Sequence, residues 1–133
     1  MISPEDLKLL QLAAKAAGIY ENICWQNSSN SPLLFKSSFK HIQKYGSDTD
    51  HGERWNPFTD DATAVRLLVQ LRLPLDYSSH SWGELDPATT CGKYWDSGES
   101  CYRPFRVRHK NDPYAATRRA IVLAAAEIGK NIK

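Results

Sequence analysis

Cysteine, long apolar runs and secretion signals are scarce or missing in this 133-residue sequence. Three cysteines are present (Cys24, Cys91 and Cys101), and an odd count makes a poor disulfide framework. We therefore expect free thiols, with a Cys91–Cys101 bridge as the alternative. No run of about 18 apolar residues exists that would span a membrane. The acidic N-terminus lacks the basic region and apolar core of a signal peptide, so we expect a cytoplasmic protein.

The spacing patterns of metal sites are also missing. Zinc sites need closely spaced ligand pairs, but no two cysteines are separated by two residues. The histidines lie far apart in the sequence (His41, His51, His80 and His109). Asp48, Asp50 and His51 cluster without the glycine and terminal glutamate of a calcium loop. We expect neither a metal nor a cofactor.

Signatures of catalysis are equally weak. There is no Walker loop and no Gly-x-Gly-x-x-Gly motif, which argues against a nucleotide-hydrolysing core. The Asp60–Asp61 pair is better explained as a helix start than as catalytic carboxylates, because acids are favourable there. Nothing local supports a Cys/His nucleophile pair. We predict no catalytic residue, and an enzyme such as a nucleotide hydrolase is the weakest of the functional hypotheses.

The composition is that of one folded domain, residues 1–133. Hydrophobic residues make up 41% and charged residues 24%, which argues against disorder. The net charge of +2 hides an asymmetry. Residues 101–133 hold eight Lys or Arg against two acids, a net +6, whereas residues 1–100 hold nine against thirteen, a net −4. The small total argues against a broad nucleic-acid footprint and favours a local anion site.

Three helices are predicted from capping residues and apolar spacing. The first spans Ser3–Gly18, the second begins near Thr59 or Asp60 and stops before Pro74, and the third is capped by Asp112 and ended by Gly129. The predicted buried face of the third helix consists of Tyr114, Ile121, Val122, Ala125 and Ile128. Its many alanines allow close approach to a sheet.

Four strands are predicted, over Ile19–Trp25, Ser31–Ile42, Leu73–Tyr77 and Tyr102–His109. The last two are expected to pair across a long loop at 78–101, and a second long loop is expected at 44–54. The order helix-strand-strand-helix-strand-strand-helix predicts an α+β fold. We expect three helices packed on one small, mainly antiparallel four-stranded sheet.

The densest polar feature is a basic strand and the residues after it: Arg103, Arg106, Arg108, His109 and Lys110. One interpretation is an anion site, for a nucleotide, a nucleic acid or an acidic protein surface. The other is the solvated face of an edge strand, kept from aggregating by its charges. Candidate stacking residues in the 78–101 loop are Trp82, Tyr94 and Trp95, for which a core role is the alternative. Arg118 and Arg119 could instead balance acids on the second helix.

Two segments are similar to a known family. Residues 55–61 read Trp-Asn-Pro-Phe-Thr-Asp-Asp, and residues 112–122 read Asp-Pro-Tyr-Ala-Ala-Thr-Arg-Arg-Ala-Ile-Val. Both, together with Leu10 and Ala13–Gly18, resemble the small tailed-phage proteins of the phage ABA-sandwich type. Phe58 departs from the leucine usual there, and the 78–101 loop also looks unlike the family. The resemblance covers the three helices, and it implies a fold and a phage or prophage origin but no activity.

Two functional hypotheses follow. The first is a non-enzymatic phage protein that counters host antiviral defence in the cytoplasm of the infected cell, by sequestering a nucleotide-like signal or by blocking a defence protein. The second is a nucleic-acid-binding accessory protein that places the same basic strand on backbone phosphates. A homo-oligomer is also possible, because an exposed edge of a small sheet invites pairing.

Overall fold

The computed structural model describes residues 2–25, 32–34, 53–78, 87–92, 95–96, 101–102 and 105–132. Within these ranges the helices are α1 (Pro4–Ala17), the short 3-10 turn η1 (Tyr20–Asn22), α3 (Asp61–Gln70) and α4 (Pro113–Lys130). The strands are β1 (Ile23–Cys24), β2 (Leu33–Leu34), β3 (Glu53–Arg54), β4 (Leu75–Ser78), β5 (Ala88–Cys91), β6 (Trp95–Asp96), β7 (Cys101–Tyr102) and β8 (Phe105–Arg108). The α+β class with three α-helices is therefore confirmed for the described part of the chain.

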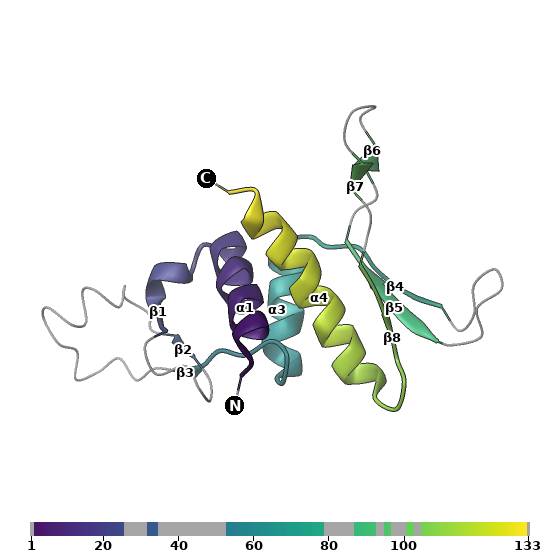
Figure 1. Cartoon of the computed structure of the whole chain (residues 1–133), viewed down its shortest axis with the longest axis horizontal. Coiled ribbons are helices and arrows are strands. Elements are labelled where there is room, and N and C mark those ends of the chain that lie inside the picture. The colour runs from purple at the N-terminus through teal and green to yellow at the C-terminus, as the bar shows by residue number, and fades with distance from the viewer. Residues whose placement is uncertain are drawn as a thin grey trace, which may run out of the picture.

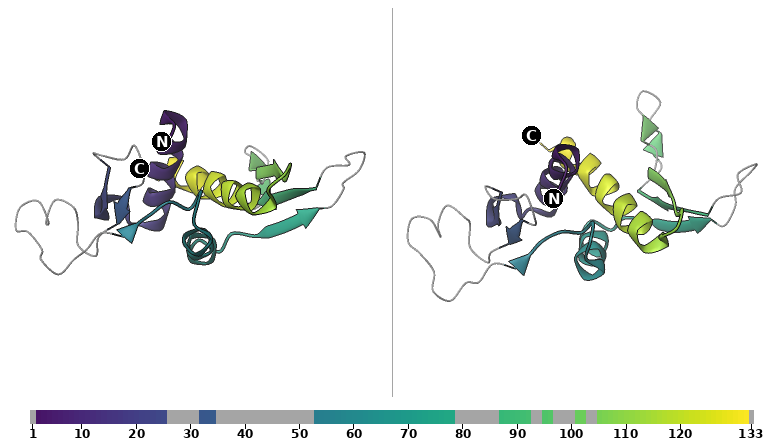
Figure 2. Two further views of the ribbon diagram at one scale, coloured as in Figure 1. Left: turned by 90° about the horizontal axis from the view of Figure 1, so that it is seen from below. Right: turned by 60° about the horizontal axis from the view of Figure 1, so that its bottom comes forward.

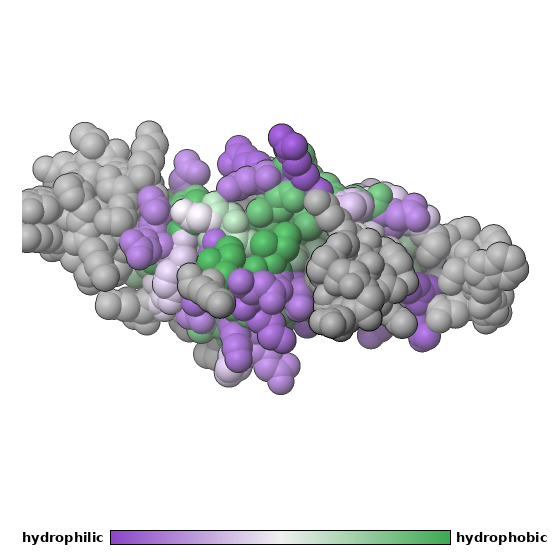
Figure 3. Space-filling model, turned by 90° about the horizontal axis from the view of Figure 1, so that it is seen from above, coloured by the Kyte–Doolittle hydropathy of each residue, from purple (hydrophilic) through white to green (hydrophobic). Residues whose placement is uncertain are grey.

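Helix α4 is the central element (Figure 1). It packs against α1 on one side and against β5 and β8 on the other, and it also contacts α3. The small sheet β1-β2-β3 lies beside α1, on the side away from α4 (Figure 2). In the view of Figure 3, hydrophobic side chains gather at the centre of the described part, with hydrophilic ones around them. The core thus centres on the helices, with a sheet on each side.

The predicted single four-stranded sheet is wrong. The described strands form two three-stranded antiparallel sheets, β1-β2-β3 and β4-β5-β8, and a two-stranded ribbon, β6-β7. The predicted direct pairing of Leu73–Tyr77 with Tyr102–His109 is also wrong, because β5 lies between β4 and β8. In that sheet Thr89 faces Tyr77 on one side and Val107 on the other. The segment predicted as a loop at 78–101 therefore supplies a central strand.

Helix α1 forms as its sequence predicts. The Ser3 hydroxyl accepts a hydrogen bond from the backbone N–H of Asp6 at 3.1 Å, which satisfies one of the free amides of the first turn. Gly18 ends the helix at φ +75°, a conformation that glycine adopts without the clash a side chain would cause. The buried face includes Leu10, Ala13 and Ala14, all fully buried in the core.

The other two helices are also capped by aspartate. The Asp60 carboxylate accepts from the backbone N–H of Thr63 at 3.2 Å, so Asp60 rather than Thr59 is the cap of α3. The Asp112 carboxylate accepts from the backbone N–H groups of Tyr114 and Ala115, both at 3.1 Å. These caps fix where α3 and α4 begin, and both helix starts border the pocket described below.

The Asp60 cap predicts an acid-dependent stability. The hydroxyl and backbone N–H of Thr63 bond the carboxylate and hold the pKa of Asp60 below its ordinary 3.8, although desolvation acts in the opposite direction. Because the folded pKa is the lower one, this contribution is present above pH 3.8 and is lost as the pH falls through the folded value. We expect Asp60→Asn, which caps but does not titrate there, to lose less stability on acidification than the wild type.

Urea unfolding from neutral pH down to about pH 2.5 measures how much stability the wild type and Asp60→Asn each lose on acidification. Thr63→Val is the companion variant, since it keeps the carboxyl but removes the hydroxyl that lowers its pKa. It should also flatten the acid dependence. An Asp60→Asn variant whose stability declines with pH as steeply as that of the wild type would refute the assignment.

The predicted end of the last helix and part of its buried face are wrong. Helix α4 continues through Gly129 to Lys130 and is capped at Asn131. Gly129 is buried, and a Cβ there would overlap the Leu12 carbonyl oxygen of α1. Tyr114, predicted to be buried, is 70% exposed. Gly129 therefore marks a close approach of α1 and α4, where a side chain has no space.

The described part of the chain contains two free cysteines. Cys24 is half-buried, and Cys91 is fully buried in β5 as a free thiol, so the prediction of free thiols is confirmed at both positions. Burial raises the pKa of Cys91 to about 11, which keeps the thiol neutral and unreactive. No helix of the described ranges has the length and apolar character needed to cross a bilayer.

Candidate functional site

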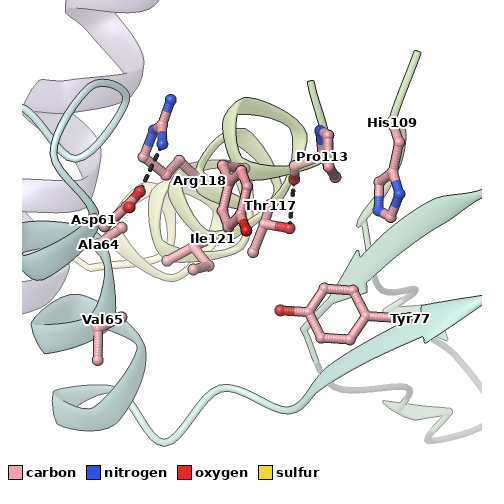
Figure 4. A pocket seen from close by; sticks show the side chains of 10 residues that line it. Asp61, Ala64, Val65, Tyr77, His109, Pro113, Thr117, Arg118 and Ile121 are labelled. Atoms are coloured by element: carbon pink, nitrogen blue, oxygen red, sulfur yellow. Dashed lines mark hydrogen bonds and ion pairs between the residues drawn. The ribbon is translucent and has the colours of Figure 1, made fainter. Parts of the chain in front are cut away.

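An open pocket of about 500 Å³ lies between α3, α4 and the β4-β5-β8 sheet (Figure 4). Its lining residues are Asp61, Ala64 and Val65 of α3, Tyr77 of β4, His109 after β8, and Pro113, Tyr114, Thr117, Arg118 and Ile121 of α4. The volume falls within the range of about 300–1,000 Å³ that is typical of small-molecule sites. The pocket is therefore the candidate functional site.

The lining follows helical spacing on both helices. Four of the α4 residues stand at i, i+3, i+4 and i+7, which places them on one face of the helix: Tyr114, Thr117, Arg118 and Ile121. The three α3 residues stand at i, i+3 and i+4. One face of α3 and one face of α4 therefore line the pocket, and Tyr77 at the end of β4 lines it from the sheet.

The walls of the pocket are mostly apolar, and large side chains at its rim are exposed. Val65 is 52% exposed, Tyr77 is 59% exposed and Tyr114 is 70% exposed. Figure 4 shows the Tyr77 hydroxyl directed from β4 toward the space beside Thr117 and Ile121. Clustered exposed apolar groups around a hollow are typical of binding surfaces.

The charged groups of the pocket neutralise each other. One Arg118 terminal nitrogen lies 2.6 Å from an Asp61 carboxylate oxygen, and the Arg118 Nε–H donates to the Phe58 carbonyl at 2.6 Å. The predicted balance between Arg118 and an acid of the second helix is thus confirmed. Arg119 instead pairs with Asp6 of α1 at 3.3 Å and lies over the Phe58 ring, so the same prediction is wrong for Arg119.

A hydrogen-bonded chain of polar side chains crosses from the sheet to α4. The Thr89 hydroxyl of β5 lies 2.6 Å from His109 Nε2 and 2.9 Å from the Thr117 hydroxyl. Thr117 in turn donates to the Pro113 carbonyl at 2.8 Å. Thr89 is fully buried, and the Tyr77 ring contacts the His109 ring edge-on at 6.3 Å. These bonds hold His109 against the sheet and connect it, through Thr89, to Thr117 of α4.

The basic strand is divided between two faces of the sheet. Phe105 and Val107 pack against the core, whereas Arg106 and Arg108 alternate with them and are exposed on the opposite face. His109 turns the other way and lines the pocket. Among the described members of the predicted cluster, Arg106 and Arg108 therefore do not share a face with His109.

The remaining predicted site residues lie elsewhere. Lys110 is exposed in the turn after His109, at φ +53°. Trp95 lies in β6 opposite Tyr102, and only its backbone is described. Arg103, Trp82 and Tyr94 lie outside the described residues, so their predicted roles stay predictions.

Several pocket residues were not predicted as site residues. Tyr77 follows Leu75 at strand spacing and shares its face, and this pattern predicts only a strand residue. Tyr114 fits the apolar face of α4, and this spacing predicts a core residue. The i, i+3, i+4 and i+7 pattern from Tyr114 was a usable signal, since it places two polar residues, Thr117 and Arg118, beside two apolar ones.

Comparisons of the chain with protein-family models, with curated proteins and with solved structures gave no match. Within the described ranges, no group of three or more metal-binding side chains comes together. The pocket is therefore the feature of the described residues that points to a function.

Proposed function

We propose that this protein is a non-enzymatic binding protein whose pocket holds a small nucleotide-like molecule. The observation that carries the proposal is the pocket itself, which pairs apolar walls and exposed aromatic rings with a polar cluster at one side. A nucleobase has the matching chemistry, because its faces stack on aromatic side chains and its edge carries hydrogen-bonding groups. The base would lie between Tyr77 and Tyr114, with its edge toward His109.

The phosphate end of such a ligand belongs outside the apolar walls. Asp61 neutralises much of the charge of Arg118 inside the pocket, which makes the interior a poor place for a bare anion. Lys110 is exposed in the turn directly after His109, and Arg118 has guanidinium N–H groups beyond those bonded to Asp61 and Phe58. These cations favour phosphates at the mouth of the pocket.

The biological setting we propose is a phage infection. Its support is the resemblance of residues 55–61 and 112–122 to small tailed-phage proteins. A non-enzymatic protein that binds a nucleotide-like signal would counter host antiviral defence by lowering the free concentration of that signal. It would act in the cytoplasm of the infected host cell. The same exposed rim could instead block a defence protein.

A second candidate, nucleic-acid binding, is favoured by one observation. Arg106 and Arg108 share the exposed outer face of β8, two residues apart, as side chains that contact backbone phosphates would. Asp76 lies in the same row across the sheet, since Thr90 pairs with Asp76 on one side and with Arg106 on the other. That carboxylate weakens the positive field of this face, so the pocket remains the better supported site.

Isothermal titration calorimetry tests the proposed function with nucleoside monophosphates, cyclic nucleotides, ADP-ribose and a random DNA duplex. We expect a nucleotide-like probe to bind and to be recovered intact after heat denaturation. Tyr114→Ala should weaken binding about tenfold, because one stacked ring is worth roughly 1–3 kcal/mol. The matched control is Val69→Ala, since Val69 is as exposed as Tyr114 but does not line the pocket.

Three outcomes would contradict the proposal. If no small probe binds, the pocket is not a nucleotide site. If the recovered probe is hydrolysed, the protein is an enzyme. If only the duplex binds, with an affinity that falls steeply with salt, the second candidate is correct.

A further inference from the structure

In the hydrogen-bonded chain beside the pocket, the Pro113 carbonyl at one end decides which group donates and which accepts in each bond. The Pro113 carbonyl can only accept, so Thr117 donates its single hydroxyl hydrogen to that carbonyl. Thr89 must then donate its hydrogen to Thr117. The Thr89 hydroxyl has no second hydrogen to give, so in its 2.6 Å contact with His109 it accepts and His109 Nε2–H donates.

The opposite arrangement, in which Thr89 donates to His109, makes fewer hydrogen bonds. If Thr89 donated to His109, Thr117 would have to donate to Thr89, and its bond to the Pro113 carbonyl would be lost. The first arrangement makes all three hydrogen bonds and the second makes two. Thr89 is fully buried, where a lost bond is not replaced by water. The structure therefore favours the His109 ring with hydrogen on Nε2.

That arrangement leaves the other ring nitrogen as an acceptor. A neutral imidazole with hydrogen on Nε2 has a lone pair on Nδ1. No donor from the described residues bonds Nδ1. The half-buried ring lines the pocket, and Figure 4 shows it across from Thr117 and above the ring of Tyr77.

We propose that His109 determines the specificity of the pocket by accepting a hydrogen bond at Nδ1 from an N–H or O–H on the edge of the ligand ring. This inference rests on the proposed function. An exocyclic amino group or a ring N–H of a nucleobase supplies such a donor, whereas an analogue with methyl groups in place of all of those hydrogens does not. Thr89 and Thr117 are positioning residues, since they act only by fixing the His109 tautomer. A site built around a ligand donor rejects an analogue that lacks it.

Nitrogen-15 NMR of the full-length protein tests the tautomer without any ligand. We expect the His109 ring, assigned by its disappearance in His109→Gln, to carry its hydrogen on Nε2. In Thr117→Val the Thr89 hydroxyl loses its acceptor and turns toward His109, so the hydrogen should move to Nδ1. Thr117→Ser keeps a hydroxyl and should restore the wild-type tautomer. An Nδ1–H tautomer in the wild type, or no change in Thr117→Val, would overturn the inference.

Calorimetry with a matched pair of probes tests the specificity. Adenosine monophosphate offers its amino hydrogens, and the N6,N6-dimethyl analogue offers none. We expect the wild type to bind the first at least tenfold more tightly, and Thr117→Val to lose that preference while Thr117→Ser keeps it. Equal wild-type affinities would overturn the role of His109 and leave the proposed function standing. If neither probe nor any other nucleotide binds, the proposed function fails as well, even if the tautomer is as expected.

Discussion

Replacing Gly129 with alanine should destabilise the protein by about 3 kcal/mol. Elsewhere in a helix the same change would stabilise it by roughly 1 kcal/mol, because alanine is the better helix former. At Gly129 the added Cβ would overlap the Leu12 carbonyl oxygen and lie 2.6 Å from the carbonyl carbon. Backbone atoms cannot rotate away as a side chain can, so α1 and α4 would have to separate.

Urea unfolding of Gly129→Ala measures this cost. Lys130→Ala is the matched control, because Lys130 is the next residue on α4, is exposed, and should change stability by no more than about 0.5 kcal/mol. The clash lies at the C-terminal end of α4, whereas the pocket residues lie in its N-terminal half. A Gly129→Ala protein as stable as the wild type would show that α1 and α4 do not approach each other so closely.

The second large effect is expected from a charge in the pocket wall. Val65→Glu should weaken nucleotide binding at least tenfold, because it replaces an apolar wall with a carboxylate beside Asp61 and repels a phosphorylated ligand. Val65 is 52% exposed and glutamate is a good helix former, so the fold should survive. Calorimetry with the best probe, and thermal unfolding without it, separate the two effects.

Val69→Glu is the control for that experiment. Val69 lies one turn further along α3, is exposed and does not line the pocket, so the same change there should leave binding within about twofold of the wild type. Equal losses in the two variants would point to a general charge effect. Unchanged binding in Val65→Glu would place the ligand outside the pocket.

The helices were predictable because their signals are local. Each helix begins at a cap whose side chain accepts from backbone amides two or three residues later: Ser3, Asp60 and Asp112. Gly18 ends α1 through its own backbone conformation. Gly129 has the same appearance in the sequence as a terminating glycine. Its role depends on Leu12, more than a hundred residues away, and no local pattern contains that information.

The central strand β5 was not predictable for a related reason. Ala88–Cys91 has small residues and no alternation of large apolar with polar side chains. Its Thr89 is buried because Thr117 and His109 satisfy its hydroxyl, and both come from other elements. Without β5 the sequence leaves β4 and β8 as direct partners, and this produced the wrong sheet.

The candidate site was predicted only in part. His109 lies in the pocket as one member of the predicted basic cluster, but strand alternation sends Arg106 and Arg108 to the opposite face. Tyr77 and Tyr114 belong to elements whose periodicity suggested a core role. The pocket forms between α3 and the end of β4, which lie apart from each other over one face of α4. This arrangement depends on tertiary packing, which no local sequence pattern contains.

Chemical-shift mapping by NMR during titration with adenosine monophosphate shows directly whether the pocket binds a nucleotide. We expect the largest changes in backbone amide signals on the pocket-lining residues of α3, β4 and α4 and on His109, and we expect Val65→Glu to need at least tenfold more probe for the same changes. Changes confined to Arg106 and Arg108 on the outer face of the sheet, or none at saturating probe, would contradict nucleotide binding in the pocket.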